Sequence, residues 1–184
     1  MANECHCDKG VFVSAKPILD EDRIHELLHE SKPVPTDFMK SAKTKPKANM
    51  SYSERELQVF GVDGSDFRLF IRQNEVWPLD FTVGLRFVDK NDLHYVLRRF
   101  NGPSHQHTNH LEKRNGDANC SFKGAFHVHM ATERYQRAGM LIDGYAEISN
   151  KFANQDQAMD LLLKQCAFSI ADDGNSKQLT LNLS

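Results

Sequence analysis

The sequence predicts an α+β fold, in which a mostly antiparallel sheet carries a C-terminal helix on one face and follows a helical N-terminal part. Two observations predict it. Apolar residues alternate with polar ones, as in strands that bury one face, and this alternation extends over 67–72, 78–89, 93–102 and 121–131. The first three runs predict a meander and the last a fourth strand. Helical spacing of apolar residues is found near the two ends, at 18–31 and 154–170, which argues against a doubly wound parallel sheet.

The chain is expected to have two parts. We predict a helical N-terminal extension over 1–60 and an α+β core domain over 61–184. Between 31 and 50 the extension is rich in Pro and Lys, and repeated X-Pro steps disfavour helix, so this stretch is expected to be a basic linker. The four residues 89–92 suit a hairpin loop within the meander.

Local signals place two helices in the N-terminal part. Asp20 is a suitable N-cap for the first helix, and acidic residues follow it in the first turn. Ser53 and Glu56 have the spacing of a capping box, and Gly61 is a suitable stop. A second, short helix is therefore predicted over 53–61.

Charge balance and apolar runs argue against several classes of protein. The formal net charge of -2 at pH 7 gives no overall electrostatic reason for tight binding to nucleic acid or to an anionic membrane, although a local patch could provide one. No run approaches the ~18 consecutive apolar residues of a membrane span, so we expect no membrane partner. The N-terminal residues MANECHCDKG lack the apolar core of a signal peptide, which favours a cytoplasmic protein.

Histidines gather in one part of the sequence. Five of the nine fall between positions 105 and 129, and four of these form two His-x-His pairs, His105/His107 and His127/His129. In the fourth predicted strand, Phe126, Val128 and Met130 would face the core, so both histidines of the second pair would point to the opposite face. Side chains at i and i+2 of a strand lie roughly 6–7 Å apart, so the two imidazoles could converge on one ligand.

The third predicted strand contributes two further polar residues. Strict alternation places Arg99 and Asn101 on one face, together with Leu97. If the third and fourth strands pair, these two residues meet His127 and His129. Two histidines can serve as base and acid near neutral pH, and an arginine can hold a phosphate. We therefore take Arg99, Asn101, His127 and His129 as candidate catalytic residues for metal-independent phosphodiester chemistry on RNA.

Two other functions remain open on the sequence. In the first, the two His-x-His pairs, His105, His107, His127 and His129, bind a small ligand or a transition metal such as zinc. In the second, the chain is a non-catalytic interaction module that contacts a partner protein through a sheet edge and a basic arm made of Lys40, Lys43, Lys45 and Lys47. An exposed sheet edge would also allow a homodimer. Histidines that merely face water would carry none of these functions.

The order of several short motifs resembles an uncharacterised family of small bacterial proteins. The motifs are Arg-x-Asn-Gly at 99–102, the histidines and asparagine of 105–109, Phe-His-x-His-x-x-Thr-Glu-x-Tyr at 126–135, Tyr-Ala-Glu at 145–147 and the helix segment 158–162. The resemblance covers roughly 65–168. The order of elements also resembles TumE-like toxins of toxin–antitoxin modules. That resemblance implies an RNA-acting or defence role and assigns no residue a function.

Overall fold

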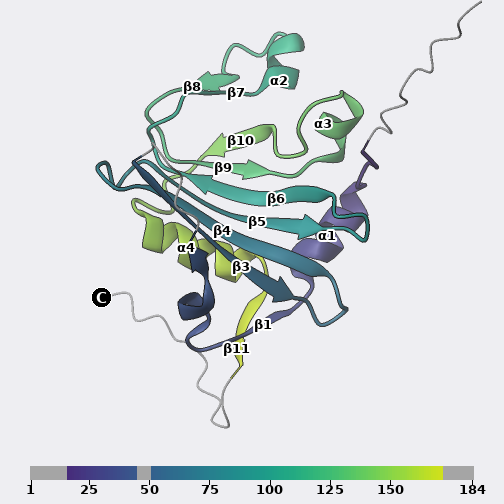
Figure 1. The fold of residues 1–184 in the computed structure, drawn as a ribbon. Helices are drawn as coiled ribbons and strands as arrows, with labels where there is room; N and C mark the ends of the chain where they lie inside the picture. The colour runs from purple at the N-terminus through teal and green to yellow at the C-terminus, as the bar shows by residue number, and fades with distance from the viewer. Residues whose placement is uncertain (1–15, 45–50, 172–184) are drawn as a thin grey trace, which may run out of the picture.

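The computed structural model describes residues 16–44 and 51–171, and it confirms the α+β class. Its described strands form a seven-stranded antiparallel sheet in the order β10-β9-β6-β5-β4-β3-β2 (Figure 1). These strands are β2 (Lys43–Thr44), β3 (Tyr52–Phe60), β4 (Asp66–Asn74), β5 (Phe81–Val88), β6 (His94–Asn101), β9 (His127–Met130) and β10 (Tyr145–Ile148). Two smaller sheets pair β1 (Lys32–Pro35) in parallel with β11 (Phe168–Ala171), and β7 (His107–Thr108) antiparallel with β8 (Ser121–Phe122). The predicted meander of β4, β5 and β6, with β9 as its fourth strand, is therefore present.

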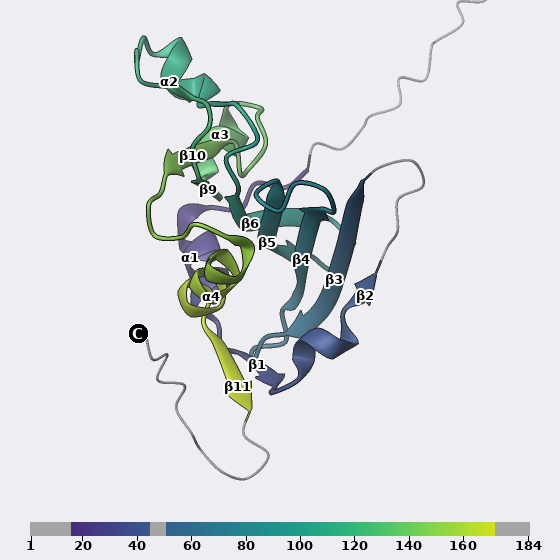
Figure 2. The ribbon, with the colours of Figure 1, turned by 90° about the vertical axis from the view of Figure 1, so that its left-hand side faces the viewer.

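The described helices are few and short. They are α1 (Glu21–His29), the 3-10 turn η1 (Phe38–Ser41), α2 (His110–Arg114), α3 (Glu133–Arg137) and α4 (Gln155–Gln165). Helices α1 and α4 lie on the same side of the sheet (Figure 2), so the C-terminal helix packs on one face as predicted. Asp20 caps α1, because its side chain accepts a hydrogen bond from the Arg23 amide at 2.7 Å. Among the described residues of the N-terminal part, α1 and η1 are the helical segments, so that part is less helical than predicted.

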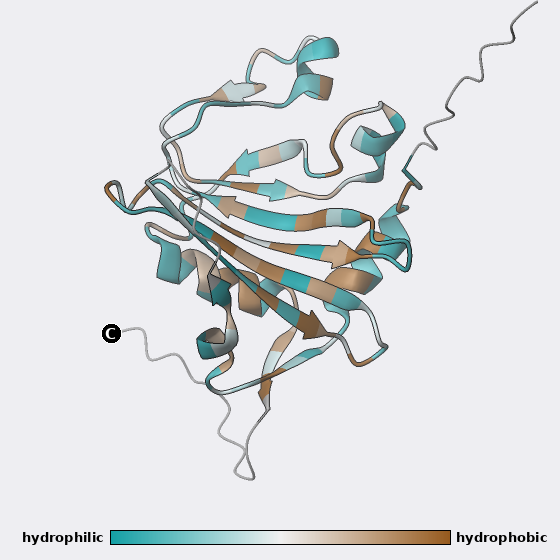
Figure 3. Ribbon diagram, in the orientation of Figure 1, coloured by the Kyte–Doolittle hydropathy of each residue, from teal (hydrophilic) through white to brown (hydrophobic). Residues whose placement is uncertain are grey.

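One hydrophobic core lies between the sheet and these two helices. Hydrophobic and hydrophilic residues alternate along the central strands (Figure 3), so each strand turns one row of side chains toward the helices. Ile24 and Leu27 of α1 and Ala158 and Leu162 of α4 complete the same core. The opposite face of the sheet is therefore available for polar side chains.

Lys32 links the ends of α1 and α4. Its side chain is fully buried, and its ammonium group donates to the main-chain oxygens of Leu27 at 2.8 Å, Glu30 at 2.7 Å and Cys166 at 2.9 Å. A cation is favoured there because both helices present carbonyl groups at their C-terminal ends. Burial lowers the pKa of Lys32 to about 8, which leaves the side chain mostly protonated at neutral pH.

The predicted helix over 53–61 is wrong, because these residues form strand β3. That strand pairs with β4 along its whole length. Leu57 and Val59 alternate toward the core, and Glu56 pairs with Arg86 of β5 at 2.6 Å instead of closing a capping box. Pairing with the edge of β4 satisfies far more backbone groups than one local cap, so tertiary structure outweighs the capping signal.

Two further expectations concern membranes and the basic arm. No helix in the described ranges is long and apolar enough to cross a membrane. Lys40 and Lys43 of the basic arm are exposed, whereas Lys45 and Lys47 lie outside the described residues. The arm therefore stays a prediction.

Candidate functional site

Strands β6 and β9 pair, and their register brings the four candidate catalytic residues together. Arg99 lies opposite His129, and Asn101 lies opposite His127. Cross-strand partners point to the same face of a sheet, so all four share the face that α4 does not cover, which we call the site face. The Asn101 amide nitrogen is 3.3 Å from Nε2 of His127.

A bulge in β6 decides which residues reach the site face. Between β5 and β6 the register steps from Leu85↔Arg98 to Arg86↔Val96, so Leu97 has no partner of its own. Leu97 stays in the core, and Arg98 reaches Gln165 of α4 at 2.8 Å. The expectation that Arg99 shares a face with Leu97 is therefore wrong, because it assumed unbroken alternation.

The site face is covered rather than open to water. After β6 the chain leaves the sheet, forms β7, α2 and β8, and returns at β9; we call residues 103–126 the excursion (Figure 1). Beneath it, His127 is 1% exposed and His129 is 4% exposed. From the excursion, His107 places its ring 4.5 Å from that of His129 and 5.9 Å from that of His127, between centroids. The two buried histidines and the half-buried His107 therefore form one cluster.

Asn109 fixes the ring of His107. The Asn109 side chain accepts from the Ala146 amide and donates to the Ala146 carbonyl oxygen, both at 2.8 Å, which identifies its oxygen and its nitrogen. The same oxygen lies 2.9 Å from Nε2 of His107. Nε2 of His107 must therefore carry the proton and donate it.

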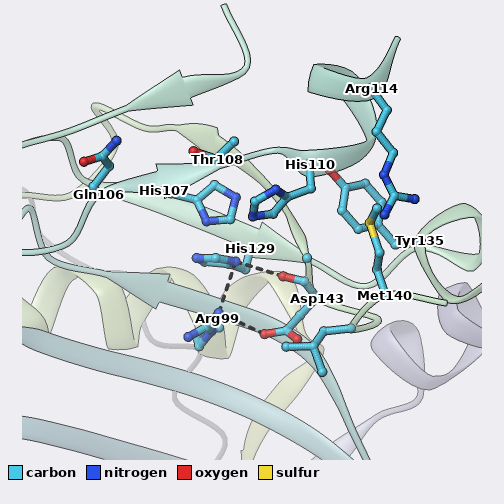
Figure 4. Close-up of a pocket in the computed structure, with 12 residues that line it drawn as sticks. Arg99, Gln106, His107, Thr108, His110, Arg114, His129, Tyr135, Met140 and Asp143 are labelled. Carbon is cyan, nitrogen blue, oxygen red and sulfur yellow. Dashed lines mark hydrogen bonds and ion pairs between the residues drawn. The ribbon is translucent and has the colours of Figure 1, made fainter. Parts of the chain in front are cut away.

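Main-chain oxygens fix the other two rings. Nδ1 of His127 donates to the Ala125 oxygen, and Nδ1 of His129 donates to the Asp143 oxygen, both at 2.8 Å. In the neutral rings, Nε2 of both histidines is therefore unprotonated and can accept a hydrogen bond. Arg99 lies 3.1 Å from Nδ1 of His129, but its firm partner is the Asp143 carboxylate at 3.1 Å (Figure 4).

Burial keeps the three imidazoles uncharged. Desolvation lowers the pKa of His107 and of His127, and lowers that of His129 to about 2; the nearby Arg99 charge acts in the same direction on each. A general acid must begin the reaction protonated. Uncharged histidines are suited to hydrogen bonding. The proton-transfer roles assigned to His127 and His129 stay predictions.

His105 does not join the cluster. Its Nε2 is 3.2 Å from the Asp80 carboxylate, and its side chain is 48% exposed. The two predicted His-x-His pairs are therefore only partly brought together. In the ranges that the structure describes, no three His, Cys, Asp or Glu side chains are grouped so that they could hold a metal ion. The metal-binding alternative stays a prediction.

A pocket of about 610 Å³ opens beside the cluster (Figure 4). It is lined by Arg99, Gln106, His107, Thr108, His110, Arg114, His129, Tyr135, Met140, Leu141, Asp143 and Gly144. Of the four candidate catalytic residues, Arg99 and His129 line the pocket, whereas Asn101 and His127 do not. Sequence reasoning missed Asp143, which stands in a loop and has no pattern around it that would point to the site.

The chain was compared with protein-family models, curated proteins and solved structures. No protein-family model, no curated protein and no solved structure matches it. The function must therefore be argued from the site.

Proposed function

We propose that the chain binds RNA and holds one phosphate-bearing nucleotide in the pocket beside the histidine cluster. The observation that carries this proposal is the set of charged groups on the wall of the pocket. Arg99 and Arg114 supply two guanidinium groups, and Asp143 is the one carboxylate among the described lining residues. With His107 and His129 uncharged, the two guanidinium groups outnumber the one carboxylate, and guanidinium groups bind phosphate well.

The remaining lining residues suit the rest of a nucleotide. A volume of about 610 Å³ lies within the roughly 300–1,000 Å³ range of small-ligand sites. Met140 and Leu141 give apolar surface for a base, and Thr108 and the imidazole of His129 offer hydrogen-bonding groups for sugar or phosphate oxygens. A pocket that encloses one base requires an unpaired nucleotide, so single-stranded RNA is the expected form.

Asp143 prepares Arg99 for this role. Its carboxylate holds the guanidinium at 3.1 Å, and its main-chain oxygen orients His129 at 2.8 Å. A side chain that is already fixed loses little entropy when a ligand binds. The resemblance to TumE-like toxins implies the same class of ligand, which supports the proposal.

Binding is tested with a short fluorescein-labelled single-stranded RNA and its change in anisotropy. Arg114→Gln is the main variant, because Arg114 is exposed and removing it disturbs no buried contact of the cluster. We expect about tenfold weaker binding and a salt dependence reduced by about one unit of log–log slope, since one phosphate contact is lost. Lys164→Gln on α4 removes the same charge from the opposite face and should bind like the parent protein.

Two results would sink the proposal. One is no RNA binding at low salt, and the other is equal weakening by Arg114→Gln and Lys164→Gln, which would indicate a nonspecific charge effect. The same mixtures run on a denaturing gel report cleavage. Cleavage that disappears in His127→Ala and His129→Ala would assign these residues to catalysis, whereas binding without cleavage would make the chain an RNA-binding protein.

A further inference from the structure

The pocket lies between the excursion and the sheet. Gln106, His107, Thr108, His110 and Arg114 line it from the excursion, and the remaining lining residues come from the sheet and the segment that follows β9. Among the described strands, β7 and β8 pair with each other and not with the main sheet. None of the five residues of α2 is buried. Figure 1 shows α2, β7 and β8 standing apart from the helix-covered core, and Figure 2 shows the same for α2.

The two ends of the excursion differ in how firmly the backbone is held. The first end is fixed by close contacts, and the second contains a glycine at which the backbone can rotate. At the first end, a Cβ on Gly102 would lie 1.7 Å from the Leu79 oxygen, and Ser104 donates to Asp80 at 2.7 Å. At the second end, Gly124 has a φ of +68°, and no described atom lies within 4 Å of the position that a Cβ would take. Glycine adopts such a φ, and others, at little cost. The excursion is therefore anchored at Gly102 and Ser104 and has a hinge at Gly124.

Besides the ring contacts of His107 and Phe122 with the buried histidines, two polar contacts hold the excursion down. Asn109 bonds the backbone of Ala146, as described above. Further out, the Glu112 carboxylate of α2 accepts the hydroxyl hydrogen bond of Tyr135 and pairs with Arg134 of α3. The Arg134 guanidinium also lies 5.1 Å from the centroid of the Tyr135 ring. These polar contacts can break and reform without disturbing the core.

We propose that residues 106–123 of the excursion form a lid over the pocket, and that Glu112, clasped by Tyr135 and Arg134, is the latch that keeps it closed. The ligand enters when the latch opens and is then enclosed between the lid and the sheet. Lid motion does not depend on which ligand binds. The expectation that RNA closes it rests on the proposed function.

The buried histidines give a direct measure of lid opening. His107 and Phe122 of the lid lie over His127, with ring centroids 5.9 and 5.2 Å away, and His129 is also covered. Raising the lid exposes the unprotonated Nε2 atoms of His127 and His129 to a histidine-acylating reagent such as diethyl pyrocarbonate. The exposed His25 provides a reference within the same molecule.

The test compares acylation rates, mapped to single histidines by peptide mass spectrometry. Glu112→Gln removes the ion pair with Arg134 at nearly constant size, and we expect His127 and His129 to react at least several-fold faster while His25 is unchanged. Glu26→Gln is the matched control, because it breaks the exposed Arg23–Glu26 ion pair of α1. Thiol reactivity of Cys166, which is 0% exposed in the core, shows whether a variant has unfolded.

Tyr135→Phe gives a second way to weaken the latch. Unchanged His127 and His129 rates in both latch variants would overturn the lid. Faster labelling that is accompanied by Cys166 reactivity would also overturn it, because the whole fold would then be opening. Single-stranded RNA should slow labelling of the parent protein. If the latch variants label faster but RNA changes nothing and does not bind, the lid stands and the RNA proposal falls.

Discussion

At the scale of single residues, the chemistry of His129 is set by its surroundings more than by its own preference for protons. Its ring is 4% exposed, and one nitrogen is engaged by a main-chain oxygen. Desolvation lowers its pKa from 6.5 to about 2. An unfolded chain would instead take up a proton as the pH falls through about 6.5.

This difference predicts acid sensitivity of the fold. Because the folded-state pKa is the lower one, stability is fully present above about pH 6.5 and is lost as the pH falls, by up to ~1.4 kcal/mol for each pH unit per histidine. We expect urea unfolding at about pH 5 to give a lower free energy of unfolding than at pH 7, and His129→Gln to show a smaller drop. His25→Gln, on the exposed side of α1, should leave the drop unchanged. Equal drops in all three proteins would contradict the buried neutral state.

At the scale of elements, the tip of the β4–β5 hairpin is pressed against the end of β6. The Gly102 amide donates to the Phe81 oxygen at 3.0 Å, and the Leu79 oxygen occupies the space of a Gly102 side chain. Asp80, beside them, receives bonds from Ser104 at 2.7 Å and from Asn74 at 3.1 Å. The hairpin thus fixes the base of the excursion.

Gly102→Ala tests this close approach. The new methyl group would meet a backbone oxygen at 1.7 Å, so the strands must separate; we expect a loss of about 2 kcal/mol in the free energy of unfolding. Gly84→Ala is the comparison, since its methyl group would meet the end of the Phe70 ring at 2.3 Å, and a ring can turn aside. Chemical denaturation of both variants measures the difference. A smaller loss for Gly102→Ala than for Gly84→Ala would contradict the proposed packing.

The elements also show what local patterns can and cannot predict. Alternation identified β4, β5 and β6, because each has one buried row over many residues. It failed for β3, where Ser53 and Glu56 have the spacing of a helix cap and only Leu57 and Val59 form a core-facing row. Alternation failed again at Leu97. A bulge depends on the twist and pairing of two strands, so the sequence of one strand alone does not reveal it.

At the scale of the whole molecule, the sequence predicted only the part of the candidate site that depends on pairing between β6 and β9. Alternation placed Arg99 with Asn101 and His127 with His129, but it put the first pair on the face of Leu97, and the bulge in β6 is what brings both pairs to one face. The burial of these residues could not be predicted, because it depends on the excursion folding back over the sheet. Asp143 comes from a distant loop, whose position is set by tertiary contacts rather than by a local pattern.

The same excursion bears on self-association. An uncovered edge strand invites pairing with a second copy. On β10, however, the Asn109 amide already bonds both the amide and the carbonyl group of Ala146, as a neighbouring strand would. The homodimer expected from an exposed edge therefore has to form elsewhere or displace Asn109.

One face of the sheet carries the core and the other carries the candidate site. Substitutions at Leu162 and Glu112 can separate these two roles. Leu162 of α4 is 0% exposed in the core, so Leu162→Ala should cost ~3 kcal/mol of unfolding free energy through a cavity and lost apolar contact. It should leave acylation of His127 and His129 unchanged under native conditions, whereas Glu112→Gln should change acylation with little effect on stability. Because the two sites lie on opposite faces and share no partner, the stability effects should add within about 0.5 kcal/mol in the double variant. Strong coupling between them would instead mean that the lid and the core open as one unit.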